Sequence, residues 1–323
     1  MRGTAETFRP VSHSLYMIDM LQRLKTYMLP IAIVTGALFY KYVELASFLT
    51  PYLIFFMLLI TYCKLSIRNM RISPLHFWLL VIQVFGSLLI YYVLLPLDSM
   101  VAEGAFICVF APTATAAAVI TGMLGGDIAC LATYSLISNM TVAFASPIIF
   151  SFMNAHGSMP FWESFLIICK QMIPLLILPF VAAIFLRRFF PKAHNALQNR
   201  QSISFYMWAV SLTIVMGKTV SFIIKQGSGN IKEEILIAFF ALIVCVAQFA
   251  LGKWVGYKNN NLIAGGQGLG QKNTVLAIWM ALVYLHPLSS IGPASYVVWQ
   301  NSINSWQLWK KQKSSGNSRK PAI

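Results

Sequence analysis

The stretch EILIAFFALIVCVAQFALGKWV, residues 234–255, is apolar along almost its whole length, and its charges lie near its two ends. A hydrocarbon core about 30 Å thick requires roughly 20 such residues in an α-helix, so this stretch has the length and composition of a membrane span. Lipid offers no hydrogen-bond partner to the backbone, and barrel strands are shorter and alternating in polarity. The stretch therefore predicts a transmembrane helix.

The same pattern recurs along the chain. Of the 323 residues, 58% are hydrophobic and only 10% are charged, whereas about a quarter of the residues of a soluble domain are charged. Hydropathy, interrupted at charges, prolines and glycines, predicts about ten spans. The predicted spans are 27–47, 49–64, 73–95, 102–122, 127–150, 161–186, 203–225, 234–255, 262–285 and 288–309. The expected fold is an all-α polytopic membrane protein.

The basic residues are concentrated in every second loop. With ten spans, 18 of the 24 lysines and arginines fall on one side of the membrane, and six of the nine acids fall on the other. By the positive-inside rule the basic side is the cytoplasm, so both termini are expected there, in a cell (inner) membrane. The predicted cytoplasmic segments include residues 1–26, which carry no apolar signal-peptide core, and the basic tail 310–323.

Several function classes are disfavoured. The formal charge of +15 belongs to membrane loops rather than to a basic face with interleaved aromatics, so no nucleic-acid partner is expected. The sequence has no pair of in-span acids, no HExxH, no GxSxG and no P-loop motif, and its histidines lack metal-ligand spacing. We therefore expect neither an enzyme nor a cofactor, and the evident partner is the lipid bilayer.

Two spans contain residues that a lipid-facing helix should not contain. The fourth span carries Pro112, Thr113 and Thr115 in the run APTATAAA, residues 111–118, and the ninth carries GGQGLGQKNT, residues 265–274. These spans are five apart, as expected for two inverted five-helix repeats, residues 27–150 and 161–309, whose broken helices cross near the middle of the membrane. The alternative interpretation is that Pro112 produces an ordinary kink and that the glycines allow helices to pack closely.

Lys272 is the most unusual single residue. An ammonium group within a span costs at least about 2.5–3.5 kcal/mol on insertion scales, so a functional role is favoured over a lysine that merely extends toward the cytoplasmic surface. For the other polar residues within the spans two roles are open: they line a transport path, or they form hydrogen bonds between helices. The candidate residues for binding a substrate or an ion are Gln83, Pro112, Thr113, Thr115, Ser135, Gln267, Gly268, Gln271, Lys272 and Asn273.

These motifs resemble the bile acid:sodium symporter superfamily along nearly the whole chain. That family has ten helices in its bacterial members, arranged as inverted five-helix repeats with a panel and a core domain, and its fourth and ninth helices are broken and cross. Residues 112–119 and 268–277 are similar to the two crossing motifs. The resemblance implies that Gln83 occupies the place of a sodium-binding glutamine and Asn273 that of a substrate-site asparagine.

The sequence departs from the family at its sodium ligands. A Ser-Asn pair is replaced by Ala117 and Ala118, and the shared acidic ligand by Gly268 or, one register away, by Gln267. Lys272 occupies the adjacent glutamine position, where its ammonium would repel a sodium ion. Our hypothesis is that Lys272 stands in for sodium, with proton exchange by Lys272 and a retained sodium ion as the alternatives.

The resemblance implies a secondary transporter that moves a small organic anion by alternating access. Lys272 and the N-termini of half-helices also favour a negatively charged substrate. A non-transporting membrane sensor or assembly protein on the same fold is the alternative, because the sodium ligands are missing. A channel is a third class, for which the sequence shows no ring of charge or filter-like repeat.

Overall fold

The computed structural model describes residues 28–65, 70–114, 116–153 and 160–317. These residues are almost entirely helical, and the only bridge of strand type among them is a single antiparallel pairing of Thr113 with Lys272. The all-α prediction is confirmed.

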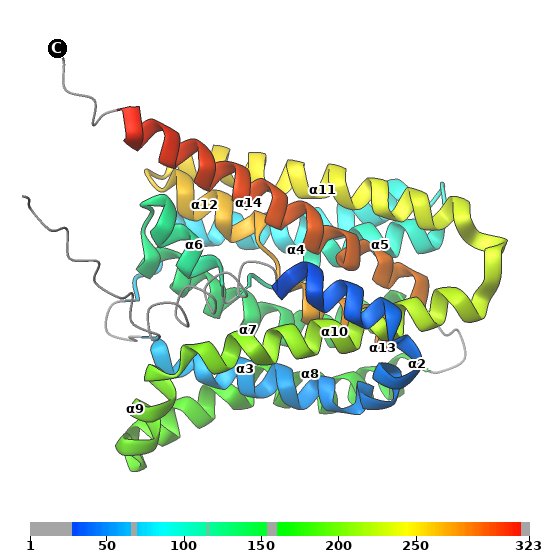
Figure 1. Cartoon of the computed structure of the whole chain (residues 1–323), viewed down its shortest axis with the longest axis horizontal. Coiled ribbons are helices and arrows are strands. Elements are labelled where there is room, and N and C mark those ends of the chain that lie inside the picture. Colours follow the sequence, from blue (N-terminus) through cyan, green and yellow to red (C-terminus); the bar gives the residue numbers. More distant parts are fainter. Residues whose placement is uncertain (1–27, 66–69, 115, 154–159, 318–323) are drawn as a thin grey trace, which may run out of the picture.

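The chain runs back and forth along the long axis of the molecule (Figure 1). An apolar helix at Met28–Leu38 comes first. It is followed by α2 (Tyr40–Val43), η1 (Glu44–Leu49), α3 (Thr50–Lys64), α4 (Pro74–Leu94), α5 (Ser99–Phe110), α6 (Ala117–Leu124), α7 (Ile128–Met153), α8 (Phe161–Phe189), α9 (Pro191–Asn199), α10 (Gln201–Gln226), η3 (Gly227–Asn230), α11 (Ile231–Lys258), α12 (Leu262–Gly270), α13 (Thr274–Tyr284), η4 (Pro287–Ser290) and α14 (Ile291–Asn317).

Six helical segments of the described chain are long and apolar enough to cross a bilayer. They are Tyr40–Lys64, Pro74–Leu94, Ile128–Met153, Phe161–Phe189, Ser202–Lys225 and Ile231–Lys258. These segments support a membrane-embedded, polytopic protein. The apolar helices α5 and α13 are shorter, because each belongs to one of the two spans that the sequence predicts to be interrupted.

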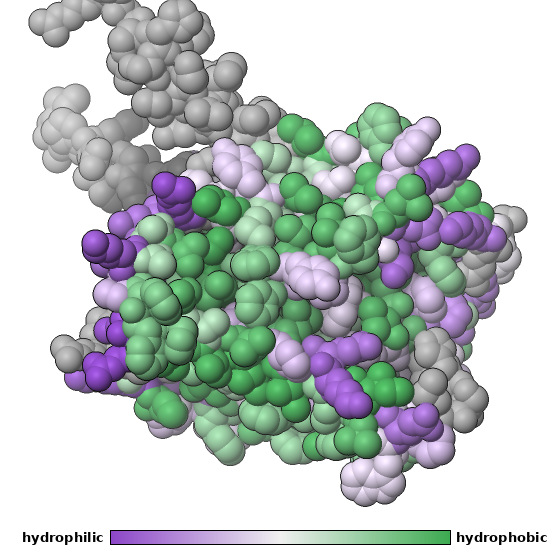
Figure 2. Space-filling model, turned by 90° about the horizontal axis from the view of Figure 1, so that it is seen from below, coloured by the Kyte–Doolittle hydropathy of each residue, from purple (hydrophilic) through white to green (hydrophobic). Residues whose placement is uncertain are grey.

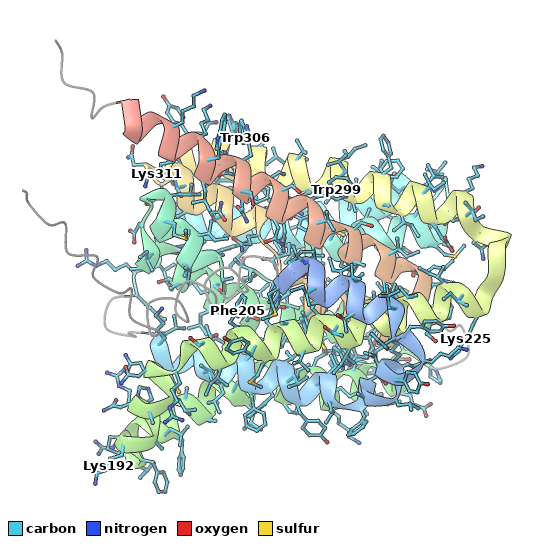
Figure 3. The ribbon with its side chains drawn as sticks, in the orientation of Figure 1. Lys192, Phe205, Lys225, Trp299, Trp306 and Lys311 are labelled. Atoms are coloured by element: carbon cyan, nitrogen blue, oxygen red, sulfur yellow. The ribbon has the colours of Figure 1, made fainter. Side chains whose placement is uncertain are left out.

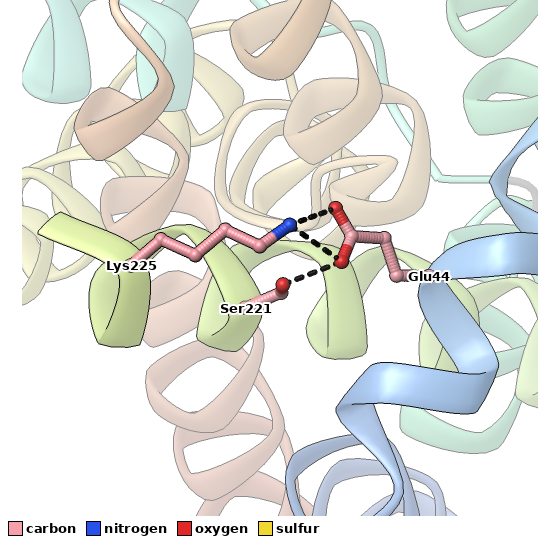
Figure 4. Close-up of polar contacts among 3 residues, drawn as sticks. All are labelled: Glu44, Ser221 and Lys225. Carbon is pink, nitrogen blue, oxygen red and sulfur yellow. Dashed lines mark hydrogen bonds and ion pairs between the residues drawn. The ribbon is translucent and has the colours of Figure 1, made fainter.

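The first predicted span, 27–47, differs from the observed structure. Helicity is continuous only over Met28–Leu38, and the chain then turns through α2 and the 3-10 helix η1 before α3 begins. Glu44 at this turn accepts hydrogen bonds from Ser221 (2.5 Å) and Lys225 (2.9 Å) of α10 (Figure 4). Because these partners are remote in sequence, hydropathy alone could not place the turn.

Two groups of helices pack through a common apolar core. Helix α3 packs against α8 and α10, while α11 packs against α5, α12 and α14, and Figure 1 shows these groups on opposite sides of the molecule. Buried residues from both groups share one cluster, including Leu58 of α3, Phe110 at the end of α5, Leu176 of α8 and Val275 of α13. This core joins the group of α3, α8 and α10 to the group that contains the broken helices.

The outer surface of α3 and α8 is hydrophobic. Large apolar side chains such as Tyr52, Phe56, Leu178 and Phe185 are exposed there, and Figure 2 shows a broad hydrophobic face bounded at both ends by hydrophilic residues. Figure 3 places Lys192 and Lys311 at one end of the molecule and Lys225 at the other. A hydrophobic belt between two polar ends is the surface that a bilayer requires.

Candidate functional site

The first break separates α5 from α6. Pro112 has no backbone N–H and its ring disfavours helical geometry in the residue before it, so a helix normally ends there. Ala111 accordingly has φ −50° and ψ 142°, and α5 ends at Phe110. Helix α6 begins at Ala117, after Ala116 has returned to helical angles of φ −68° and ψ −18°.

The second break separates α12 from α13. Gln271, at the end of α12, has the extended angles φ −103° and ψ 102°. Asn273 then caps α13, because its side-chain oxygen accepts a hydrogen bond of 3.3 Å from the backbone N–H of Leu276. The unwound segment is therefore limited to Gln271, Lys272 and Asn273.

The two breaks cross and are joined by backbone hydrogen bonds. The N–H of Ala114 donates to the carbonyl of Gln271 at 2.9 Å, and the N–H of Asn273 donates to the carbonyl of Pro112 at 2.8 Å. Thr113 and Lys272 pair between these two bonds. Unwound backbone at membrane depth is tolerated where protein surrounds it, and Thr113 and Lys272 are both fully buried.

Lys272 places its ammonium at the C-terminus of α5. Its Nζ donates to the carbonyl of Val109 at 2.7 Å, one of the last carbonyls of the helix, where the partial charge is negative. Its backbone N–H donates to Oε1 of Gln300 at 2.8 Å, and Nε2 of Gln300 donates to its carbonyl at 3.3 Å. Within the described chain no carboxylate pairs with Lys272.

Gln83 occupies the other side of the first break. Its Nε2 donates to the carbonyls of Phe110 (2.9 Å) and Ala111 (3.3 Å), and its Oε1 accepts from Tyr134 (2.9 Å) and Ser138 (2.8 Å). Carbonyls at the end of a helix lack intrahelical partners. Gln83 satisfies two of them, and its own carboxamide is fully bonded within the protein.

Hydroxyl groups cap the C-terminus of α12. Oγ1 of Thr113 donates to the carbonyl of Gly268 at 2.7 Å, and the hydroxyl of Tyr296 donates to the carbonyl of Gly270 at 2.8 Å. Gln248 of α11 donates to Tyr296 and to the carbonyl of Cys108. The ends of both half-helices are therefore held by side chains from neighbouring helices.

The glycines of the ninth predicted span have two different roles. A Cβ on Gly265 would lie 2.3 Å from the backbone oxygen of Gly252 and 2.7 Å from Cα of Gly256, so Gly265 allows α11 and α12 to pack closely. A Cβ on Gly268 would lie 3.0 Å from the ring of Tyr134. The close-packing interpretation holds for Gly265, whereas Gly268 lies beside the network of Gln83.

The predicted site residues are not all at the crossing. Pro112, Thr113, Gln271, Lys272 and Asn273 form it. Gln83 and Gly268 bond directly to its edges, and Ser135 donates to the carbonyl of Thr113 at 3.4 Å. Gln267 instead faces α14, where it donates to Asn304 at 2.9 Å. Thr115 lies outside the described residues.

Four residues of the site were not expected from the sequence: Tyr134, Ser138, Tyr296 and Gln300. A partial signal existed for α7, because Ser135, Ser138 and Asn139 have the spacing of one helical face. Tyr296 and Gln300 are likewise four residues apart on α14. Their partners lie in other helices, so periodicity indicates the face but not the contact.

Several buried amide oxygens around the crossing accept no hydrogen bond from any described residue. They are Oε1 of Gln271, Gln267 and Gln248 and Oδ1 of Asn139. Buried acceptors are almost always paired in proteins. Of these oxygens, Oε1 of Gln271 belongs to the crossing itself, where it can accept a hydrogen bond from a ligand or bind a cation.

No protein-family model matches the chain, and a search of curated proteins finds no significant match. Its function is therefore inferred from the site itself.

Proposed function

We propose that the protein is a secondary membrane transporter, resembling the bile acid:sodium symporters, which moves a small organic anion by alternating access. The observation that carries the proposal is the crossing of the two helix breaks around Thr113 and Lys272. Paired discontinuous helices in corresponding positions of two repeats are the arrangement in which many carriers bind substrate and coupling ion.

The helix order supports two inverted repeats. We count α5 with α6, and α12 with α13, as one interrupted pass each. These two passes, the six long segments, the helix Met28–Leu38 and α14 make ten passes. The interrupted passes are then the fourth and the ninth, and an odd repeat of five inverts on duplication. The positive-inside rule would place both termini in the cytoplasm.

The ammonium of Lys272 takes the role of a bound sodium ion in this proposal. It carries the same single charge and bonds to the carbonyl of Val109 at the end of α5. Neither Gly268 nor Gln267 supplies a carboxylate, and Gln83 bonds to carbonyls of the protein. Sodium coupling is therefore lost or altered, and an anionic substrate would be attracted to the buried cation.

The movement required by alternating access would occur between the group of α3, α8 and α10 and the group that holds the crossing. Their shared core is mostly apolar, and a direct side-chain hydrogen bond joins them where Tyr284 of α13 donates to Gln171 of α8 at 2.7 Å. Apolar contacts are non-directional, so they allow one group to slide against the other without leaving many polar groups unpaired.

Sodium binding tests the role of Lys272 without knowledge of the substrate. The purified protein is unfolded by heat in detergent, and its eight tryptophans report the transition in sodium, potassium or choline chloride. Ligand at a hundredfold excess over its dissociation constant adds about 2.7 kcal/mol to stability. We expect wild type to ignore sodium and Lys272→Gln to be stabilised by it, while the control Lys170→Gln behaves as wild type.

The full burial and internal bonding of the crossing favour one alternative, a non-transporting sensor or assembly protein on the same fold. The two functions differ in their dependence on motion between the groups. A reducible bifunctional methanethiosulfonate cross-linker that joins Gln171→Cys to Tyr284→Cys, long enough to span the distance that the two native side chains bridge, should abolish uptake of organic anions into proteoliposomes, and reduction should restore it. Absence of uptake of any organic anion by the unlinked protein would favour the sensor.

A further inference from the structure

A second candidate site lies at the basic end of the molecule, away from the crossing. A hollow of about 230 Å³ opens between the ends of α3 and α8 and the short helix α9. Its lining includes Cys63, Lys64, Arg187, Pro191, His194 and Asn195. A water molecule occupies about 30 Å³ of the liquid, so the hollow is large enough for a polyatomic group.

The charge of this hollow is uncompensated. Lys64 and Arg187 come from different helices, and no acidic residue lines the hollow. The ion pair formed by described residues joins Lys225 to Glu44, so neither Lys64 nor Arg187 has an acidic partner in the described chain. Two like charges that face one hollow repel each other. An anion between them would turn this repulsion into attraction.

His194 provides a buried polar wall. It is only 8% exposed, and its Nδ1 lies 3.5 Å from Oδ1 of Asn195, at the limit of a hydrogen bond. Its Nε2 makes no hydrogen bond to a described residue. The ring and the amide of Asn195 can both offer hydrogen bonds to a ligand in the hollow.

The residues beside the hollow are of the kind found at the level of lipid head groups. Helix α8 ends beside it with Phe185, Phe189 and Phe190 exposed to the surroundings, and aromatic residues concentrate at the level of the membrane interface. Figure 1 shows α9 at the tip of the molecule beyond the ends of α3 and α8. Basic pockets between helix ends at this level bind anionic head groups.

We propose that this hollow binds a phosphate group, carried either by an anionic phospholipid or by a free ion. The guanidinium of Arg187 suits the bidentate geometry of phosphate oxygens. Lys64 adds a second cation from the opposite helix, and His194 and Asn195 add hydrogen-bond donors. A phosphate held there would link the ends of α3, α8 and α9.

The test uses the full-length protein in detergent with three additions: phosphatidylglycerol, phosphatidylcholine and inorganic phosphate. Native mass spectrometry counts the bound lipid, and tryptophan fluorescence follows thermal unfolding. We expect phosphatidylglycerol to bind and to raise the melting temperature, with no such effect of phosphatidylcholine. If inorganic phosphate alone raises the melting temperature as much, the proposal also holds, and the ligand is the free ion.

Matched variants locate the site. Arg187→Gln should weaken phosphatidylglycerol binding about tenfold or more, as expected for the loss of a charge-assisted hydrogen bond, and Lys64→Gln should do likewise. Arg188→Gln removes the same charge from the next position, which does not line the hollow, and should bind as wild type. Equal losses in Arg188→Gln and Arg187→Gln, or no binding of either phosphate source to wild type, would overturn the proposal. If Arg187→Gln fails to fold, phosphatidylglycerol binding by Lys64→Gln is compared with that by Arg188→Gln instead.

Discussion

Two lysines in this protein lie in opposite surroundings. Lys272 is fully buried at the crossing, where its ammonium bonds to a backbone carbonyl. Lys225, at the other end of α10 from α9, has a side chain that is 65% exposed and lies 2.9 Å from the carboxylate of Glu44 (Figure 4). The exposed lysine has an acidic partner, and the buried lysine has none within the described residues.

The difference is the reason for proposing a functional role for Lys272 rather than for Lys225. Exposed ion pairs contribute little to stability, and such a lysine is readily replaced. A buried ammonium without a carboxylate is costly to insert and is expected to be retained only for a reason. The ammonium of Lys272 bonds to the carbonyl of Val109 near the C-terminus of α5, where the helix dipole favours positive charge. This contrast is what the following predictions test.

Reversal of charge at the two lysines should produce the largest contrast. Lys272→Glu places a carboxylate against the carbonyl of Val109, and an uncompensated buried charge costs about 3–5 kcal/mol. We expect thermal unfolding by tryptophan fluorescence to occur at a much lower temperature, with a lower yield of folded protein. The control Lys225→Glu should change the melting temperature little. Similar stability of the two variants would contradict the assignment of Lys272 to the buried crossing.

Removal of the amide of Gln83 should have the next largest effect. Gln83→Leu leaves the carbonyl of Phe110 and the hydroxyls of Tyr134 and Ser138 without their partner, and each orphaned buried group costs about 1–3 kcal/mol. The matched comparison at the exposed pair is Ser221→Ala, which removes one hydrogen bond to Glu44. A smaller loss of stability in Gln83→Leu than in Ser221→Ala would show that the crossing does not depend on this network.

Close packing beside the crossing should tolerate less change than the turn near Lys225. A methyl group on Gly252 would lie 2.3 Å from the backbone oxygen of Gly265, whereas one on Gly229 would meet nothing within 4 Å. Gly252→Ala should therefore cost about 1–3 kcal/mol through overpacking, and Gly229→Ala should be nearly neutral. The melting temperatures of the two variants measure this difference, which would vanish if α11 and α12 separated easily.

The sequence predicted the long helices well because their signal is local. The predicted runs 161–186 and 203–225 agree with α8 (Phe161–Phe189) and α10 (Gln201–Gln226) to within a few residues. The boundary between the first two spans was predicted near residue 48, whereas the first helix already ends at Leu38; Glu44 in the following turn bonds to Ser221 and Lys225, which are far away in sequence. Proline, glycine and charge also located both helix breaks, since each of these residue types is unfavourable in a lipid-facing helix.

The sequence did not predict how the site is assembled. Gln300 bonds to both backbone groups of Lys272, and Tyr296 caps Gly270, but nothing in α14 specifies these partners. Gln267, a predicted site residue, donates to Asn304 of α14, and consecutive residues of a helix point about 100° apart. The rotation of a short half-helix about its axis decides which of its residues faces the crossing. This rotation is set by packing against other helices.

Mutation of the exposed pair of Glu44 and Lys225 should change the melting temperature least. Glu44→Gln removes the charge that faces Lys225, and an exposed pair is worth less than about 1 kcal/mol. Salt screens such pairs, with a Debye length of about 10 Å at 0.1 M ionic strength, so the difference in melting temperature between Glu44→Gln and wild type should shrink as potassium chloride is added. The hydrogen bond from the buried hydroxyl of Ser221 can persist to the amide oxygen, which limits the loss further.

The effect of Lys272→Glu should change little with salt, because a buried group is poorly screened. An equal response of both variants to salt would mean that Lys272 is accessible to solvent, and the proposed role of its ammonium as a built-in cation would then fail.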